Sequence, residues 1–310
     1  MTIAFRKQPF SYKLFIPIKY LFLYIFLFFN HPALTNAQDS LTRKKIYHVN
    51  YLTNSIILVA GAATDAIAIS RIKNKSSLTA TEIAALNPND VNSIDRWALH
   101  LNPTNYKTYG RVSDIIEPPM FIIFPLLLGF DKEIKKDWKD LLFMYLQGHV
   151  ITFTFYNYSW LGPTFQSRIR PLSYYTSLPM AARTDGGNRN SFYSGHTAST
   201  AFTTFFIAKV YSDYHPEIGA MKYLLYTVAL IPPVVMGYLR VKSLAHFPSD
   251  DMAGLSLGAA LGIIIPALHK INYKGITVGL SSEPEAAGIA LYWNLSPLKS
   301  FKLFDNKMSD

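Results

Sequence analysis

The chain has 310 residues, of which 50% are apolar and only 16% are charged, and its mean hydropathy is +0.13. A disordered chain combines low hydrophobicity with high charge, and a soluble domain carries roughly 25% charged residues, so the composition excludes the first and argues against the second. The formal net charge of +10 is spread between apolar runs and forms no patch, which argues against nucleic-acid binding. Because the chain has no cysteine, disulfides, iron–sulfur clusters and thiolate zinc sites are excluded. The composition predicts a membrane protein.

The first 37 residues have the features of a secretory signal peptide. Four basic residues and no acid accompany the apolar block 20–29, and Thr35 and Ala37 provide small residues ahead of Gln38. The apolar block is well below the ~20 residues that a membrane span needs. We therefore expect cleavage after Ala37, with an uncleaved membrane anchor as the alternative.

Several apolar stretches mark the candidate membrane helices, since they are longer than strands usually are. They are 48–70 (interrupted by Asp65), 118–130, 141–167, 190–208, 223–239 and 252–269. The stretch 118–130 is short and would need residues 112–117 to span. In the last stretch Gly254, Gly258 and Gly262 recur every four residues, a stripe along which a neighbouring helix can approach closely. The sequence predicts an all-α, polytopic transmembrane bundle of about five or six spans.

The polar linker and the tail carry weaker structural signals. Thr79 and Glu82 have the spacing of a capping box, which predicts a short helix. Residues 276–280 and 288–293 alternate as strands do, which predicts a small C-terminal β-hairpin. The predicted domains are 1–37 (signal peptide or anchor), 38–114 (first helix and polar linker), 115–270 (helical core) and 271–310 (tail).

The distribution of lysines predicts the orientation in the membrane. The loop 131–140 holds four lysines, so the positive-inside tendency places it in the cytoplasm. Segments 159–196 and 240–251 should then share the opposite face, the periplasmic face of a bacterial inner membrane. A cleaved signal would leave residue 38 outside, and a full span at 51–70 would then invert this arrangement. Either that stretch is not a simple span, or the signal prediction is wrong.

Polar and charged residues, which are energetically costly to place in a membrane, are concentrated in the two segments predicted to share a face. They are Arg168, Arg170, Arg183, Arg189, Ser194, Gly195 and His196 in the first segment, and Arg240, Lys242, His246, Asp250 and Asp251 in the second. Several guanidinium groups beside a helix start form a pocket for a tetrahedral dianion. Two histidines add a nucleophile and a proton donor, and a carboxylate near His246 can orient its ring. The pattern predicts phosphate-ester hydrolysis through a phosphohistidine, with arginines supplying the charge stabilisation.

Three motifs, in this order, resemble the signature motifs of the type 2 phosphatidic acid phosphatase superfamily. They are Arg170-Pro171, Ser194-Gly195-His196 and Arg240-x5-His246-x3-Asp250. Members of this superfamily include membrane lipid phosphatases, soluble bacterial acid phosphatases and vanadium haloperoxidases. The resemblance covers about residues 115–270. It implies that His246 is the phosphorylated nucleophile, that Asp250 orients it, and that His196 protonates the leaving oxygen. It also implies a phosphate site made of Arg170, Ser194, Gly195 and Arg240.

The motifs depart from the family pattern at three positions. Pro163 occupies the usual lysine position of the first motif, Tyr193 replaces a proline, and Leu239 replaces a serine. The candidates for replacing the missing cation are Arg168, Arg183 and Lys242. The loss of one phosphate-binding cation bears on rate or substrate preference more than on the type of reaction.

The sequence therefore predicts a membrane lipid phosphatase that acts on a phosphorylated lipid and needs neither cofactor nor metal. One alternative is a periplasmic acid phosphatase acting on soluble esters. Another is a non-catalytic membrane scaffold or phospholipid-binding protein that lost activity with the motif lysine. A metal site made of His196, His246 and Asp250 is disfavoured, because the nearby cations would repel a metal ion.

Overall fold

The structure is a computed structural model that describes residues 45–159, 162–271, 276–283 and 286–293. The chain divides into two compact units, Met1–Arg43 and Lys44–Asp310, and the description below concerns the second unit. The predicted signal segment 1–37 lies outside the described residues.

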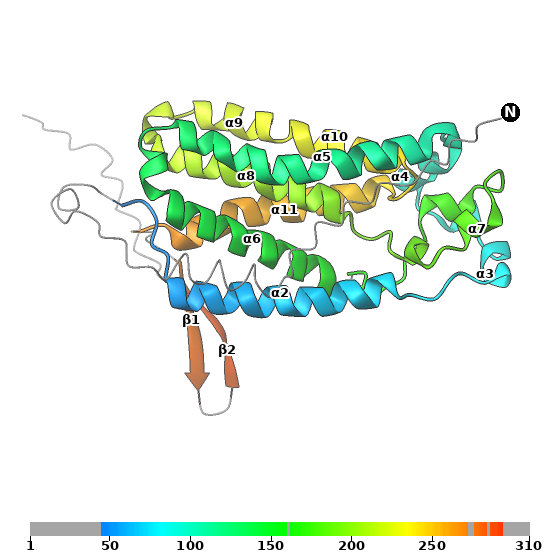
Figure 1. Ribbon diagram of the computed structural model, residues 1–310, viewed down its shortest axis with the longest axis horizontal. Helices are drawn as coiled ribbons and strands as arrows, with labels where there is room; N and C mark the ends of the chain where they lie inside the picture. The colour runs from blue at the N-terminus through cyan, green and yellow to red at the C-terminus, as the bar shows by residue number, and fades with distance from the viewer. Residues whose placement is uncertain (1–44, 160–161, 272–275, 284–285, 294–310) are drawn as a thin grey trace, which may run out of the picture. The chain divides into compact units, whose positions relative to one another are not determined.

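Long helices lying side by side form the described part of the chain (Figure 1). They are α2 (Tyr51–Lys73), α5 (Tyr106–Leu126), α6 (Trp138–Tyr158), α8 (Gly195–Tyr214), α9 (Met221–Ala229), α10 (Ile231–Lys242) and α11 (Pro248–His269). The short helices are α3 (Ala80–Ala84), α4 (Ser93–Arg96) and α7 (Met180–Arg183). Strands β1 (Ile276–Glu283) and β2 (Ala286–Trp293) pair antiparallel, with Ile276 opposite Trp293. The predicted helical bundle is confirmed, and the capping box at α3 is present.

Four segments within the described residues are long and apolar enough to cross a membrane. They are Tyr51–Lys73, Pro103–Phe130, Met221–Lys242 and Pro248–His269. The predicted number of about five or six spans exceeds this count because α6 and α8, although long, carry polar side chains that are buried between helices. Helix α5 begins at Tyr106, inside the predicted linker. The sequence interpretation placed its start later because Lys107 and Arg111 interrupt the apolar pattern there.

Helix α8 is the central helix of the bundle. It contacts α5, α6, α9, α10 and α11, and most of its side chains are buried. The Ser194 side chain caps its start, and Pro216, which cannot continue a helix, follows its end. The second motif therefore lies at the N-terminus of the most enclosed helix.

The predicted glycine stripe of α11 is confirmed as the contact surface with α8. A Cβ atom at Gly254 would lie 2.4 Å from the Ser194 carbonyl oxygen, and one at Gly258 would lie 2.1 Å from that of Ala198. At Gly262 the nearest atom would be the Phe202 carbonyl oxygen at 2.8 Å. These separations are shorter than a side chain tolerates, so glycine is what allows the two backbones to touch. The contact brings the start of α11, with Asp250, against the start of α8.

We expect Gly258→Ala to destabilise the fold by about 1–3 kcal/mol, because the added methyl group meets backbone that cannot rotate away. The measurement is thermal unfolding of the purified protein in detergent. Gly129→Ala is the control, since a Cβ at Gly129 meets nothing within 4 Å. Equal melting temperatures for the two variants would contradict the role of the stripe.

Helix α2 extends from one end of the bundle to the other. Just before it begins, the His48 N–H donates to the His269 carbonyl at the end of α11 (2.8 Å), and in its middle Asn157 donates to Asp65 (3.0 Å). Near its end the Ile72 carbonyl accepts from the Asn190 side chain (3.3 Å), in the loop that precedes α8. The stretch 51–70 is therefore a full-length helix. Its start lies at the same end of the bundle as the loop 131–140, and the predicted motif residues lie at the other end.

Candidate active site

A tight turn of residues 243–247 between α10 and α11 carries His246. Leu244 is fully buried and has a φ of 58°, a left-handed conformation that costs a non-glycine residue about 1–3 kcal/mol. Its carbonyl accepts a hydrogen bond from the Leu172 N–H (3.1 Å), which ties the turn to the segment that follows Arg170. The turn thereby holds the first and third motifs together.

His246 is buried, and its ring is held in one orientation. Its Nδ1 lies 2.5 Å from the Ser191 carbonyl oxygen, which can only accept, so Nδ1 carries a proton and donates it. Burial, and after it the positive charges of Arg240 and Arg170, lowers the pKa of His246 well below its ordinary value of 6.5. The imidazole is therefore neutral at pH 7 with an unprotonated Nε2, which is the form that acts as a nucleophile.

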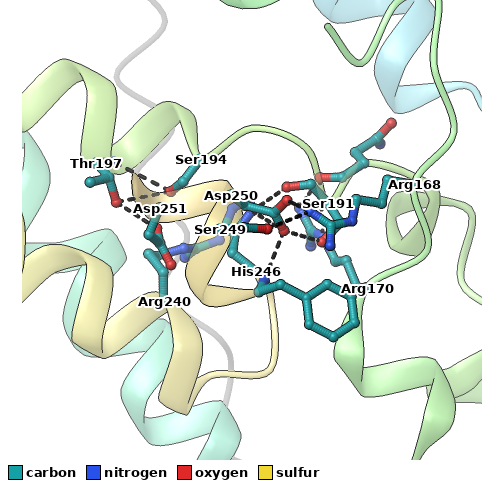
Figure 2. A network of polar contacts seen from close by, with 12 residues as sticks. Arg168, Arg170, Ser191, Ser194, Thr197, Arg240, His246, Ser249, Asp250 and Asp251 are labelled. Atoms are coloured by element: carbon teal, nitrogen blue, oxygen red, sulfur yellow. Dashed lines mark hydrogen bonds and ion pairs between the residues drawn. The ribbon is translucent and has the colours of Figure 1, made fainter. Parts of the chain in front are cut away.

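Asp250 lies close to His246 but hydrogen-bonds to other groups. Its Oδ2 is 4.0 Å from His246 Nδ1, and it accepts hydrogen bonds from Ser191 Oγ (2.6 Å) and from the Phe247 N–H (2.8 Å). Its Oδ1 forms an ion pair with Arg168. Figure 2 shows the cluster in which Asp250 is bonded to both Ser191 and Arg168. Asp250 holds the segment whose carbonyl orients His246, and its negative charge lies near the ring.

A second carboxylate, Asp95 in α4, completes this network. It accepts from Arg168 Nη2 (2.6 Å), from the Ser249 N–H (2.8 Å) and from the Ser249 hydroxyl (2.5 Å). Burial disfavours its charged form, but the hydrogen bonds from Ser249 and Arg168 outweigh burial and hold the pKa of Asp95 below its ordinary value. Arg168 thus bridges Asp95 and Asp250. The sequence interpretation missed Asp95, for which the N-capping pattern at Asn92 was the only local signal.

We expect Asp95→Asn to lower the free energy of unfolding by about 2–3 kcal/mol, because it removes a charge-assisted bond to Arg168 in a buried network. Thermal unfolding in detergent measures this loss. Asp90→Asn is the matched control, since Asp90 is exposed at the neighbouring turn. If Asp95→Asn had the same melting temperature as the control, the bridging role of Asp95 would be contradicted.

The start of α8 is bonded to the start of α11. Thr197 Oγ1 donates to Asp251 Oδ1 (2.6 Å), and the Ser194 N–H donates to the Asp250 carbonyl (3.1 Å). The Ser194 hydroxyl caps α8 by accepting from the Thr197 N–H (3.4 Å). This cluster and the Asp250 cluster lie on either side of the His246 turn (Figure 2). The first N–H groups of α8, beginning at Gly195, have no partner within the helix and point out of its N-terminus.

His196, in the first turn of α8, contacts two carboxylates of α5. Its Nε2 lies 3.1 Å from Asp114 Oδ1 and 3.3 Å from Glu117 Oε2. The same Asp114 oxygen accepts from Arg240 Nη1 (3.1 Å), so one carboxylate joins His196 to the buried guanidinium of the third motif. The two carboxylates hold the His196 ring against α5. Acidic residues beside an apolar run are costly, and that signal could have pointed to Asp114 and Glu117.

A cavity of about 480 Å³ opens beside the motif residues. Arg170 and Arg240 line it from the motif side, and Lys107, Arg111 and Asp114 line it from α5. Burial and the charge of Arg240 lower the pKa of Arg170 to about 10, so the guanidinium stays charged at pH 7. Within the described residues, the Arg170 guanidinium makes only long hydrogen bonds of 3.4 Å to the Asn190 carbonyl, which leaves it able to bind an anion. The two guanidinium groups give the cavity positive charge that can bind a phosphate.

Comparison with known proteins agrees with this geometry. Residues 140–274 match the family model described as the PAP2 superfamily. Over this segment the chain is similar to the PAP2 superfamily. The family resemblance inferred from the motifs is confirmed, and the match supports a phosphatase-type function, that of a phosphoester hydrolase. No match was found among curated proteins.

One solved structure resembles the chain: the "Crystal structure of the first transmembrane PAP2 type phosphatidylglycerolphosphate phosphatase from Bacillus subtilis". The two share 19% sequence identity, with a TM-score of 0.38. The alignment covers 68% of this chain and 94% of the other.

The PAP2 motif residues come together at one end of the bundle, but the three candidate auxiliary cations do not line the cavity. Arg168 is bound by two carboxylates, as described above. Arg183 is buried and donates to the Ser173 carbonyl (2.9 Å), and Lys242 lies over the Tyr109 ring at 5.5 Å. Pro163, which occupies the usual lysine position of the first motif, is buried.

Proposed function

We propose that this protein hydrolyses a lipid phosphate or diphosphate at the membrane surface through a phosphohistidine intermediate. The observation that carries the proposal is the state of His246, a buried neutral imidazole whose Nδ1–H is donated to Ser191 and whose Nε2 is unprotonated beside two arginines. The PAP2 match and the apolar helices support a substrate held at a membrane.

The first step is phosphoryl transfer to His246. Its Nε2 forms a bond to phosphorus while the bond from phosphorus to the leaving oxygen breaks, and His196 gives that oxygen a proton. Arg170, Arg240 and the N-terminus of α8 stabilise the charge on the three equatorial oxygens. Asp114 and Glu117 hold the His196 ring in position for this donation.

The second step is hydrolysis of the phosphohistidine. Water attacks phosphorus, neutral His196 removes a proton from this water, and the N–P bond breaks with its electron pair returning to His246. Phosphate leaves, and His196 is again protonated. The cycle uses side chains alone, so we propose that it needs no metal ion.

The test is phosphate release by the detergent-purified protein from phosphatidate, phosphatidylglycerol phosphate, a polyprenyl diphosphate, lipid A and a water-soluble aryl phosphate. We expect release from at least one lipid, unchanged by a metal chelator. If folded protein released no phosphate from any substrate of the panel, the proposal would be overturned and a non-catalytic scaffold would be favoured. Turnover of the soluble ester alone would favour an acid phosphatase, and a loss restored by metal would refute the metal-free mechanism.

We expect the acid limb of kcat/KM to lie below pH 6.5, because the lowered pKa keeps His246 neutral there. The rate falls only as the pH drops through this lowered pKa, where the imidazole gains a proton and loses its lone pair. Arg170→Gln removes one of the positive charges that lower this pKa, so it should move the acid limb upward. The measurement is a pH profile of kcat/KM for both proteins. Ionisation of the substrate does not depend on the variant, so an unmoved limb would argue against His246 as the titrating group.

We further propose that the site faces outward, with the lysine-rich loop 131–140 in the cytoplasm. Because α2 crosses the bundle, residues 45–50 then also face the cytoplasm, whereas cleavage after Ala37 would give the opposite orientation. The chain has no cysteine, so single cysteines report the orientation directly. In spheroplasts, a membrane-impermeant maleimide should label Asn89→Cys at the site end and spare Lys135→Cys in the loop. The reverse pattern would establish an inward-facing site.

A further inference from the structure

The cavity beside the motifs contains two cations that the PAP2 match does not include. Lys107 and Arg111 are one helical turn apart on α5, which precedes the matched residues 140–274. Both side chains are exposed. Within the described residues neither side chain forms a hydrogen bond or an ion pair, and Lys107 Nζ lies 5.8 Å from the centre of the ring of its neighbour Tyr106. Their charges are therefore available to a ligand.

These cations share a cavity with the phosphate-binding arginines, which distinguishes them from ordinary surface charges. Together with Arg170 and Arg240 they give the cavity four positive side chains, against the single carboxylate of Asp114. That carboxylate is already bonded to Arg240 and His196, so it does not neutralise Lys107 or Arg111. A single phosphate held by the two arginines would leave the charge on α5 uncompensated.

The position of His196 shows which side of the scissile bond these cations occupy. His196 contacts Asp114, which follows Lys107 and Arg111 on the same face of α5. In the proposed mechanism His196 protonates the leaving oxygen, so the leaving group lies toward α5. The cations therefore extend the site on the leaving-group side, away from the transferred phosphoryl group.

We propose that Lys107 and Arg111 form a second anion subsite that binds the phosphate of the leaving group, so that the preferred substrate is a lipid diphosphate. This inference rests on the proposed function. Attack of His246 on the terminal phosphorus breaks the P–O–P bridge and releases a lipid monophosphate, on which negative charge develops. Two cations stabilise that charge, whereas an alcohol released from a monophosphate is neutral and gains nothing from them. The subsite lies near one end of a candidate span, where the phosphates of a lipid are found.

The experiment compares kcat/KM for a polyprenyl diphosphate, the matching polyprenyl monophosphate and a water-soluble diphosphate ester. The test variants are Lys107→Gln, Arg111→Gln and the double variant, and the conservative pair Lys107→Arg and Arg111→Lys tests rescue. The matched control is Arg71→Gln with Lys73→Gln, an exposed Arg and Lys in the last turn of α2. These residues lie at the same end of the bundle but do not line the cavity.

We expect wild type to prefer the lipid diphosphate to the monophosphate. Each Gln variant should lower that preference about tenfold and the double variant about 100-fold, with rescue by the conservative pair and no change in the control. An equal loss on both lipids, or a wild-type preference for the monophosphate, overturns the subsite while leaving the proposed function intact. No release from either polyprenyl lipid by a wild-type protein that acts on another lipid of the panel overturns the subsite alone, and no release from any substrate of the panel overturns both proposals. If kcat/KM for the soluble diphosphate ester equals that for the lipid diphosphate and falls in the same two variants, the subsite stands, but the proposal that its substrate is a lipid is refuted.

Discussion

Replacing His246 with alanine should abolish phosphate release from every substrate, a loss of about 10⁴-fold or more in kcat, because no other group can form the phosphoenzyme. The ring is the only candidate nucleophile in the described part of the chain that is neutral, buried and oriented between the two motif arginines. The measurement is steady-state phosphate release, together with acid-labile phosphate bound to the protein after quenching. Both signals should disappear in the variant.

The control for this experiment is His215→Ala. His215 lies after the end of α8, at the opposite end of that helix from His196, where it contacts Asp131 and Glu217. It should retain wild-type turnover and wild-type phosphoenzyme. Because His246 is buried, a melting curve must show that its variant is folded. Substantial phosphate release by a folded His246→Ala protein would remove this residue as the nucleophile.

Replacing His196 with alanine should slow release from a lipid phosphate by about 10²–10⁴-fold, the range expected when a general acid is lost. An alkoxide leaves poorly unless it is protonated as its bond to phosphorus breaks. A nitrophenolate is stable as an anion, so the same variant should slow release from p-nitrophenyl phosphate by less than about tenfold. The measurement is the ratio of kcat for the two substrates in wild type and variant.

Asp114→Asn distinguishes the acid role of His196 from a merely structural one. Asp114 contacts His196 Nε2 and positions the ring, so its loss should slow release from the lipid phosphate by more than release from p-nitrophenyl phosphate. A structural defect would slow release from both substrates equally. If His196→Ala slowed both substrates equally, proton donation to the leaving group would be refuted.

Local patterns in the sequence predicted the helical membrane bundle well, and they failed where charge interrupts a helix. The glycine stripe was read correctly because its four-residue spacing is a property of one helix. The start of α5 was missed because Lys107 and Arg111 ended the apolar run in the sequence, although the helix continues through them. The four segments of the described residues that are apolar enough to span do not include α6 and α8, because these two helices carry polar side chains that are buried against other helices.

At the candidate site, too, local patterns were predicted from the sequence and contacts between distant residues were not. The order and spacing of the three motifs are visible in the chain, and they led to the family that the comparison then confirmed over residues 140–274. Their partners are not visible there. Asp95 lies 73 residues before Arg168, and Asp114 lies 82 residues before His196, so no spacing rule connects either pair.

By itself, the sequence determined the membrane class, the succession of helices and the position of the motifs, because hydropathy and short spacing are properties of neighbouring residues. Only the tertiary structure decided which charges meet. It assigned Arg168 to two carboxylates, joined His196 to α5, and brought Lys107 and Arg111 to the cavity of the motif arginines. The physical reason is that the partner of a buried charge is set by how helices distant in the chain pack, and the glycine contact between α8 and α11 fixes that packing here.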